Sequence, residues 1–289
     1  MQFIAFILTY PLLWIISVLP FRLLYFLSDT IFLLVYYIIG YRKITVRKNL
    51  SIALPHLNEK ELLQIEKKFY HHLCDVFLEM IKTLTISEKE MNKRFICKNL
   101  SDLRALESKG KSIAVLTSHY ASYEWSISMN KNLGFEGFAI YKKIANRYFD
   151  KLVRDIRSKF GATLITTKET ISTIEKNYRK GHLGIYGFAS DQSPKSSKAH
   201  HWGTFFGVTT PFQTGAEMLS KRFDMTVLLM EVKKIKRGYY EATFKTLSEN
   251  PTTVPDYEIT DLFMKKLENQ ILEAPEYYLW THKRFKYVK

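Results

Sequence analysis

The second half of the chain alternates short apolar runs with segments of helical periodicity. Runs of this kind, separated by helices and apolar at nearly every position, are typical of strands that helices cover on both faces. Five runs have strand length and composition: residues 112–118, 137–141, 162–166, 183–188 and 225–232. Residues 238–245 indicate a late antiparallel strand, and residues 257–272 a final surface helix. The pattern predicts an α/β fold with a mixed, largely covered sheet and surrounding helices.

An amphipathic helix is expected ahead of this region. Between Glu59 and Leu84 the apolar residues recur every three or four positions. They are Leu62, Ile65, Phe69, Leu73, Val76, Met80 and Leu84. This spacing puts them on one helix face, which we expect to pack on the domain behind it. We therefore divide the chain into residues 1–40, a helical membrane-proximal region at 41–99, and an α/β domain at 100–289.

The N-terminal region is almost entirely apolar. No charged residue occurs from Gln2 to Leu19, and only Arg22 and Asp29 interrupt the apolar run that continues to Gly40. The first run is close to the roughly 20 apolar residues that a membrane-spanning helix needs. Four basic residues follow: Arg42, Lys43, Arg47 and Lys48. We interpret residues 1–40 as a membrane anchor and interfacial helix, followed by a cationic surface that faces anionic lipid. The alternative is a pair of buried core helices.

Charge and cysteine usage narrow the partners and the compartment. Forty-three Lys and Arg against 28 Asp and Glu leave a net charge of +15, so the partners should be anionic. Phosphorylated substrates, acidic lipids, acidic proteins and nucleic acids all satisfy that condition. Only two cysteines occur, Cys74 and Cys97, without a CxxC motif. A disulfide framework is not indicated, and a reducing cytoplasmic location fits.

One short motif carries candidate chemistry. His119 follows the apolar run 112–118 directly, and Glu124 comes five residues later. The end of a strand is where a rigid scaffold presents a side chain to solvent. On a continuous helix the two residues would diverge by about 140°, so they can meet only if His119 precedes the helix and Glu124 lies in its first turns. In that arrangement the carboxylate accepts from one ring nitrogen and the other nitrogen acts as a base. Spacing alone favours the ordinary alternative, a helix-start Glu beside an unrelated His.

Other catalytic and metal-binding motifs are missing from the sequence. Gly110-Lys111-Ser112 ends like a phosphate-binding loop, but Ala105 stands where the first glycine is required. No Gly-x-Ser-x-Gly sequence provides a serine nucleophile. The histidine pairs, at 71–72 and 200–201, are adjacent and do not share a face. Most of the aromatic residues fall in apolar segments, so we expect them in the core or at a membrane rather than stacked on bases. We expect no cofactor, no metal and no nucleic-acid partner.

The ordered set of motifs resembles the late acyltransferases of lipid A biosynthesis, within the lysophospholipid acyltransferase group whose signature is His-x4-Asp/Glu. The matching pieces cover most of the chain in the family's order. They are Tyr41-Arg42 through Asn49-Leu50 and Pro55, His119 to Glu124, Tyr141-Lys142 with Asn146, Phe149, Arg154, Arg157 and Gly161, Asp191 to Pro194, Phe205-Phe206-Gly207, Pro211, Thr214-Gly215 and Pro275 to Phe285.

The resemblance implies an activity and a set of roles. The activity is O-acyl transfer from acyl carrier protein to a hydroxyl of a lipid A precursor at the inner membrane, with the catalytic domain in the cytoplasm. His119 would be the general base and Glu124 would support it. The residues expected to bind substrate are Lys142, Asn146, Arg154, Arg157, Asp191 and Gln192. For Arg154 and Arg157, a solvated helix face is an equal alternative, and Asp191 could instead form a turn before Pro194.

Two positions depart from the family pattern. Ala121-Ser122-Tyr123 stands where the family usually has Gly-Asn-Trp, and Lys142-Lys143 follows Tyr141 where the family has Arg-Pro. Lys supplies charge to a phosphate but not the planar fork of Arg, so acceptor geometry should differ.

Two other functions stay open. One keeps the chemistry and changes the acceptor to another lysolipid or an aminoacyl lipid. The other is a non-catalytic cationic protein that binds membrane or nucleic acid, for which binding without turnover and a strong salt dependence are expected.

Overall fold

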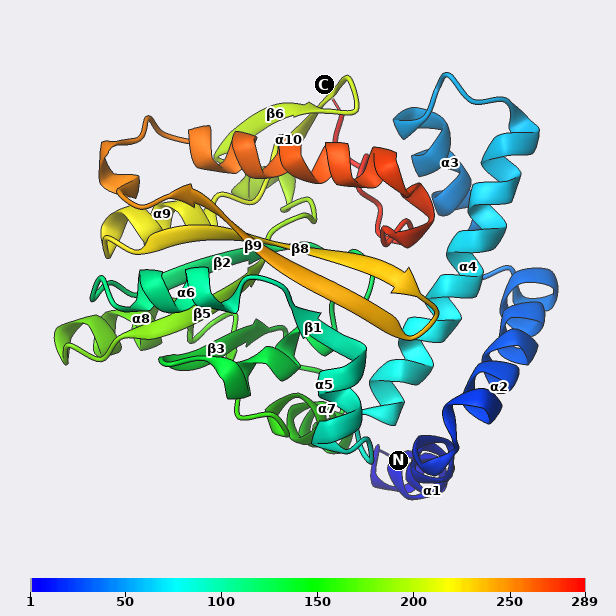
Figure 1. The fold of residues 1–289 in the computed structure, drawn as a ribbon. Coiled ribbons are helices and arrows are strands. Elements are labelled where there is room, and N and C mark those ends of the chain that lie inside the picture. Colours follow the sequence, from blue (N-terminus) through cyan, green and yellow to red (C-terminus); the bar gives the residue numbers. More distant parts are fainter. Residues whose placement is uncertain (1, 289) are drawn as a thin grey trace.

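The computed structural model describes residues 2–288 and has a seven-stranded sheet at its centre (Figure 1). Its strands are β1 (Phe95–Cys97), β2 (Ile113–Thr117), β3 (Glu136–Tyr141), β4 (Thr163–Thr166), β5 (Gly184–Ala189), β8 (Thr226–Lys236) and β9 (Tyr239–Ser248). All six predicted strands are present, and β1 was not anticipated. The α/β prediction is confirmed.

The strand order is β1-β9-β8-β2-β5-β3-β4. Strands β8, β2, β5, β3 and β4 run parallel, while β9 returns antiparallel to β8 and β1 follows β9. The sheet is therefore mixed, as predicted. The central strand β2 is covered on both faces, because Ile113, Ala114 and Leu116 are all at most 1% exposed. Its uninterrupted apolar sequence follows from that position.

Helices surround the sheet. They are α5 (Glu88–Arg94), α6 (Leu100–Glu107), α7 (Arg147–Ser158), α8 (Thr170–Arg179), α9 (Gly215–Arg222) and α10 (Glu258–Glu273), with the 3-10 helices η2 (Trp125–Asn132), η3 (Ser196–Lys198), η4 (Pro251–Thr253) and η5 (Pro275–Tyr277). In Figure 1, α10 crosses one side of the sheet. Its buried face carries Phe263, Leu267 and Ile271. The surface helix predicted at 257–272 is thus confirmed: one face is buried, and the exposed face carries its charged residues together with Leu262 and Leu272.

The predicted amphipathic helix is α4 (Glu59–Lys82), which begins with a capping box between Asn58 and Glu61. The arrowhead of β8 points toward α4 in Figure 1. Because β2, β5, β3 and β4 run parallel to β8, their carboxyl ends also lie on the α4 side of the molecule. Trp125, just beyond the end of β2, donates to the backbone oxygen of Glu79 on α4 at 3.0 Å. The helix therefore lies close to the sheet edge where parallel α/β folds place their ligands.

A small hairpin, β6 (His201–Phe205) with β7 (Val208–Phe212), was not predicted. Its two-residue turn is Phe206-Gly207, and both residues have positive φ, 52° and 73°. Such a turn usually carries Asn-Gly or Gly-Gly, so Phe at its first position concealed the hairpin. The motif Phe205-Phe206-Gly207 is this turn.

The N-terminal region forms α1 (Gln2–Val18) and α2 (Phe21–Leu33), which continues as a π-helical segment, η1 (Leu34–Ile39). One face of α2 packs along α4, where Ser28 donates to Asp75 at 2.7 Å. The outward faces are apolar and exposed: Ile4 is 61%, Leu8 74%, Phe26 72% and Ile38 78% exposed. The alternative of two buried core helices is therefore wrong. Within the described residues, Phe21–Ile39 is long and apolar enough to cross a membrane.

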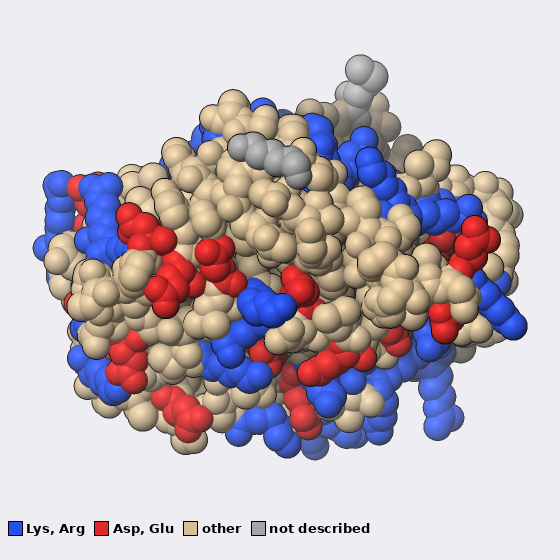
Figure 2. Space-filling model, turned by 90° about the horizontal axis from the view of Figure 1, so that it is seen from above, with Lys and Arg blue, Asp and Glu red and all other residues tan. Residues whose placement is uncertain are grey.

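Two of the basic residues that follow these helices are exposed and also bonded to groups of the protein. In α3 (Lys43–Ala53), Arg47 pairs with Glu66 at 2.8 Å. Just before α3, Arg42 donates to the backbone oxygen of Thr281 at 3.0 Å. Arg42, Arg47 and Lys48 are exposed, so positive charge is present at the surface here, and Glu66 balances that of Arg47. On the face seen in Figure 2, Lys and Arg side chains lie interspersed with Asp and Glu, and uncharged residues cover the surface between them.

Candidate active site

His119 and Asp191 come from neighbouring strands of the sheet. Thr117, the last residue of β2, is paired in register with Ala189, the last residue of β5. His119 and Asp191 each follow two residues later, so both leave the same sheet edge side by side. The backbone N–H of Ser190 donates to the oxygen of Thr117 at 3.0 Å and extends the pairing beyond the strands. The carboxyl ends of adjacent parallel strands thus bring together residues that lie far apart in sequence.

The two side chains are hydrogen-bonded. Nδ1 of His119 lies 2.7 Å from Oδ1 of Asp191. The Asp191 side chain is 1% exposed, whereas that of His119 is 22% exposed. A buried carboxylate accepting from Nδ1–H selects the tautomer in which Nε2 carries the lone pair. His119 is therefore oriented with one nitrogen held and the other free to exchange a proton.

The surroundings also set the pKa of both groups. Burial lowers the pKa of His119, but the charge of Asp191, its hydrogen bond and the charge of Glu124 together outweigh burial and raise that pKa above its ordinary value. Burial raises the pKa of Asp191, and the contact with His119 outweighs it in the opposite direction. The pair therefore favours an ionised Asp191 and an imidazolium that forms readily.

Glu124 does not hold the His119 ring. It lies at the start of η2 without a capping hydrogen bond from its side chain. Its carboxylate accepts from Nη2 and Nε of Arg157, at 2.6 and 3.0 Å. The side chain of Glu124 is 9% exposed and that of Arg157 26%. The expected hydrogen bond between Glu124 and a ring nitrogen of His119 is thus corrected: Asp191 makes it, and Glu124 acts on His119 through its charge. The physical reason is the sheet register: Thr117 is paired with Ala189, so Asp191 leaves the sheet edge directly beside His119.

The turn after His119 is fastened by the C-terminal segment Pro275–Phe285, which we call the closing segment. Ala121 N–H donates to the oxygen of Tyr277 at 2.9 Å, and Leu279 N–H donates to the oxygen of His119 at 3.0 Å. Ala121 has φ of 50°, a left-handed conformation that costs a residue with a Cβ about 1–2 kcal/mol. The family's usual glycine at this position would adopt that conformation without the cost.

The closing segment is itself held from two sides. Nδ2 of Asn49 donates to the oxygens of Trp280 and His282, each at 2.7 Å. On the other side, Ser193 N–H donates to Nε2 of His282 at 3.3 Å. Burial lowers the pKa of His282 to about 4, so its ring is a neutral acceptor. Asn49 and Ser193 therefore hold the closing segment from two sides, and the closing segment in turn holds the turn after His119.

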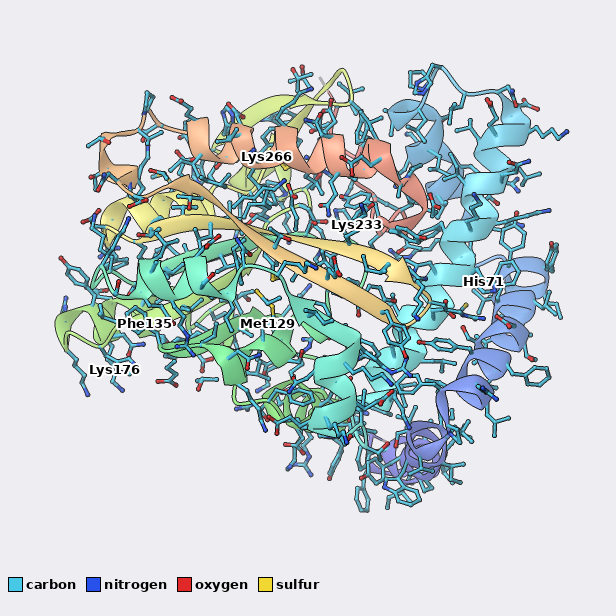
Figure 3. The ribbon with its side chains drawn as sticks, in the orientation of Figure 1. His71, Met129, Phe135, Lys176, Lys233 and Lys266 are labelled. Carbon is cyan, nitrogen blue, oxygen red and sulfur yellow. The ribbon has the colours of Figure 1, made fainter. Side chains whose placement is uncertain are left out.

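A cavity of about 770 Å³ opens beside His119. Its polar residues cluster at the sheet edge and the remaining wall is mostly apolar. Met129, labelled near the centre of Figure 3, belongs to that wall and comes from η2. Apolar lining residues are Met80, Val115, Ile127, Met129, Leu133, Phe138, Ile140, Val153, Leu164, Ile185, Phe188, Met230 and Phe244. We call this the apolar cavity. Its volume and lining suit a small molecule or a chain of hydrocarbon character.

The remaining sequence-predicted residues fall in three places. Lys142, Gln192 and Arg157 line the apolar cavity. The amide nitrogen of Gln192 lies 3.5 Å from both ring nitrogens of His119, across the ring rather than on one lone pair. Arg154 lines a separate hollow. Asn146 caps α7, accepting from Tyr148 N–H at 3.0 Å, and donates to the oxygen of Gln2 at 3.3 Å.

The sequence did not reveal the pairing of His119 with Asp191 or the role of Asn49. Each of His119 and Asp191 was noted at a strand end, but the strand neighbours were unknown. Asn49 was noted only because Asn49-Leu50 is among the pieces that resemble the acyltransferase family. Among the described residues, no group of three or more His, Cys, Asp or Glu side chains is placed to hold a metal ion.

Along nearly its whole length the chain is similar to known proteins. The family described as bacterial lipid A biosynthesis acyltransferase matches residues 2–287. Among curated proteins, the chain is 22% identical over 280 residues to the lipid A biosynthesis lauroyltransferase of Escherichia coli strain K12, covering 95% of this chain and 89% of that protein. It is 23% identical to the palmitoleoyltransferase of the same strain, over 85% and 79%. The lipid A biosynthesis acyltransferase of Haemophilus influenzae is 22% identical over 83% and 74%.

Proposed function

Because this chain belongs to the bacterial lipid A biosynthesis acyltransferase family, we propose that it transfers a fatty acyl group from acyl carrier protein to a hydroxyl of a lipid A precursor. The observation that carries this proposal is the hydrogen-bonded pair of His119 and Asp191 at the mouth of the apolar cavity. A positioned imidazole next to an apolar cavity supplies a base and a binding site for a chain.

The pair supports direct transfer. Nε2 of His119 takes the proton of the acceptor hydroxyl while the oxygen of that hydroxyl attacks the thioester carbonyl carbon. The C–S bond then breaks, the ester forms, and the imidazolium returns its proton to the departing thiolate. Asp191 accepts from Nδ1 throughout and stabilises the imidazolium, as a buried carboxylate does in other base-assisted acyl transfers. Glu124 adds negative charge nearby while it holds Arg157 at the cavity wall.

The apolar cavity suits the acyl chain of the donor. Burial of each methylene group is worth about 0.8 kcal/mol, so a chain that fills the cavity gains affinity with every added carbon until the wall stops it. Gly187, midway along β5, lines this cavity, and an added Cβ there would meet only the backbone oxygen of Phe138, at 3.7 Å. A larger side chain at Gly187 would project into the space that the chain occupies.

The N-terminal helices suit attachment to the inner membrane with the catalytic domain in the cytoplasm. Ion pairs and hydrogen bonds tie the inner face of α2 to α4, and the apolar outer face is left for lipid. Aromatic contacts join α1 to α7, with Phe6 5.5 Å from Phe149 between ring centroids. Since α7 also carries Arg157, the lipid-facing helices lie one helix away from the candidate active site.

The test is an assay of the full chain in membranes or detergent, with acyl carrier protein bearing lauroyl or palmitoleoyl groups and a lipid A precursor as acceptor. Mass spectrometry should detect one added acyl group, and His119→Ala should abolish it while the protein stays folded and membrane-bound. Gly187→Leu should shift the preference toward the shorter donor. If acyl transfer occurs only to lysophospholipids or aminoacyl lipids, the proposed acceptor is wrong and the proposed chemistry stands. Salt-sensitive binding without any turnover would refute acyl transfer.

A further inference from the structure

A second hollow lies beside the apolar cavity and has no role in the mechanism above. Its volume is about 490 Å³, and it shares Tyr141 and Leu164 with the apolar cavity. The carboxyl ends of β3 and β4, α7 and the first turns of α8 form its walls. We call it the polar groove, and most of its lining residues bear charges or hydroxyls: Lys143, Arg154, Thr166, Glu169, Ser172, Thr173 and Lys176.

Three cations line the polar groove: Lys143 just after β3, Arg154 on α7 and Lys176 on α8. All three are exposed. Within the part of the chain that the structure describes, none of the three has a carboxylate oxygen within 4.0 Å. Like charges brought together without counter-charges repel one another, so their convergence in a hollow favours an anion between them.

Their neighbours on the same helices behave differently. On α7, Lys151 pairs with Asp155 at 2.6 Å, and on α8, Arg179 pairs with Glu175 at 2.6 Å. Carboxylates are thus available to solvated cations on both helices, one turn away. Among the described residues, Arg154 and Lys176 have no such ion pair; Arg147 and Lys180, outside the groove, have none either, so what distinguishes the groove is that its cations converge on one hollow.

One carboxylate, Glu169, lies in the polar groove, and it is directed to the backbone. Its Oε2 accepts from the N–H of Thr166 at 3.0 Å and from its Oγ1 at 2.7 Å. These hydrogen bonds, and then the charges of Arg154 and Lys143, lower the pKa of Glu169. The groove therefore keeps an excess of positive charge. Thr173, on the face of α8 that carries Lys176, adds a hydroxyl, whereas the hydroxyl of Ser172 donates to the backbone oxygen of Glu169 at 3.0 Å. With its three cations, the lining suits a compact anion rich in acceptor oxygens.

The position of the groove suits a headgroup whose chain is at the catalytic site. The groove and the apolar cavity meet at Tyr141, and Lys142 lies on the cavity side of the same strand end. The first turn of α7 packs on α1 through Tyr148, 5.6 Å from Phe6 between ring centroids. Lys176 is on the opposite side of the view from His71 on α4 in Figure 3, so the groove is separate from the charges that bind α2 to α4.

We propose that the polar groove binds a phosphate monoester of the acceptor headgroup, through Lys143, Arg154 and Lys176, while the acceptor hydroxyl reaches His119. This proposal rests on the proposed function, since it names where the acceptor of that reaction is recognised. A concave site with converging cations and hydroxyls fits a phosphate better than the acidic surface of a carrier protein, which would dock on a broad convex patch.

The first experiment compares two acceptors with the full chain: a phosphorylated lipid A precursor and the same lipid after phosphatase treatment. The double variant Lys143→Ala/Lys176→Ala should raise KM for the phosphorylated acceptor at least about tenfold, the loss expected for charge-assisted hydrogen bonds. Its kcat, its KM for the thioester donor and its KM for the dephosphorylated acceptor should stay near those of the wild type. Lys180→Ala, also on an exposed lysine at the end of α8 but outside the groove, is the matched control.

The second experiment measures binding directly and does not depend on turnover. N-acetylglucosamine 1-phosphate should bind the full chain with a salt-sensitive affinity that the double variant loses, and N-acetylglucosamine should not bind. An equal loss for both acceptors, or binding of the phosphate sugar that the double variant retains, would overturn the proposal. A defect confined to KM for donors on acyl carrier protein, and absent with an acyl-pantetheine donor, would overturn it too, because the cations would then dock the acidic carrier. If no acyl transfer occurs but the phosphate sugar binds as expected, the proposed function fails and the anion site stands.

Discussion

Two histidines lie close to the carboxyl edge of the sheet and differ in partner, pKa and access. His119 pairs with the carboxylate of Asp191, and its pKa is raised. His72 on α4 lies 3.1 Å from the ammonium of Lys234, and burial, reinforced by that charge, lowers its pKa well below the ordinary value. The first ring opens on the apolar cavity, while the second is 5% exposed.

Charged residues surround His72 in a set that we call the buried charge cluster: His72, Asp75, Glu79, Lys234 and, partly exposed at its edge, Arg237. Burial, and then the charge of Asp75, raise the pKa of Glu79 to about 7, yet no cavity of the site reaches its side chain. Both of its oxygens accept from tyrosine hydroxyls, those of Tyr25 and Tyr240. A perturbed pKa therefore marks burial as readily as it marks catalysis, and access with the right partner is what distinguishes the two regions.

The largest effect should separate the histidines. His119→Gln removes the base and should lower kcat by about 10²- to 10⁴-fold, with the thermal midpoint nearly unchanged. His72→Gln keeps an acceptor for Lys234 and should leave kcat within about twofold, at a cost to stability of roughly 1 kcal/mol. Steady-state acyl transfer and thermal melts of both variants decide it. Equal loss of kcat in the two variants would contradict the assignment of His119, and not His72, as the base.

Next comes the buried charge cluster. Asp75 is 1% exposed and takes Arg237 at 2.6 Å and Lys234 at 3.7 Å. Asp75→Asn leaves Lys234, whose side chain is 9% exposed, without this counter-charge, while Arg237 keeps Asp29 as a partner. The variant should cost about 3–5 kcal/mol of unfolding free energy. Denaturant unfolding measures the loss, and the folded fraction should keep the wild-type kcat. Lys151→Ala, which breaks an exposed pair, should cost less than about 0.5 kcal/mol.

Replacing the partner of the catalytic base should change the pH dependence of activity. A base works when neutral, so the acid limb of the kcat/KM profile follows the raised pKa of His119. Asp191→Asn removes the charge that raises this pKa but leaves the burial that lowers it, so the limb should move to lower pH. The same variant should lower the maximal rate about 10²-fold, because the tautomer is no longer selected.

Glu124→Gln should change the pH dependence of activity less than Asp191→Asn does. It should move the limb in the same direction by less, since Glu124 acts on His119 through its charge without holding the ring. An acid limb that stays in place in Asp191→Asn would contradict the assignment of the base.

The smallest effect concerns the turn that carries His119. Ala121→Gly relieves the positive φ, worth about 1–2 kcal/mol, and gives back about 0.4–1 kcal/mol through a more flexible unfolded chain. The net gain of about 0.5–1 kcal/mol should raise Tm by roughly 2 °C in a scanning melt. Ala114→Gly, in the middle of β2, should lower Tm instead. A lower Tm for Ala121→Gly would show that the turn does not store strain.

The sequence by itself determined the elements and much of the site. Short apolar runs predicted the six principal strands, and apolar residues spaced by three or four predicted the long helix α4. Both signals are local, because the burial of a strand or of a helix face requires apolar residues at nearby positions of the chain. His119 and Asp191 were each identified at a strand end, and the apolar N-terminal helices were evident from Gln2–Leu19 and its continuation. Each of these properties depends on residues near one another in the chain.

Only the tertiary structure decided which of these pieces meet. The neighbours of a strand are set by how the whole chain wraps around the sheet, so no local pattern showed that β2 lies beside β5 and that Asp191, rather than Glu124, takes the ring of His119. The same reason applies to Asn49, which reaches across 231 positions to Trp280. Local sequence determines which segments are buried, and long-range packing determines which side chains those segments bring within hydrogen-bonding distance.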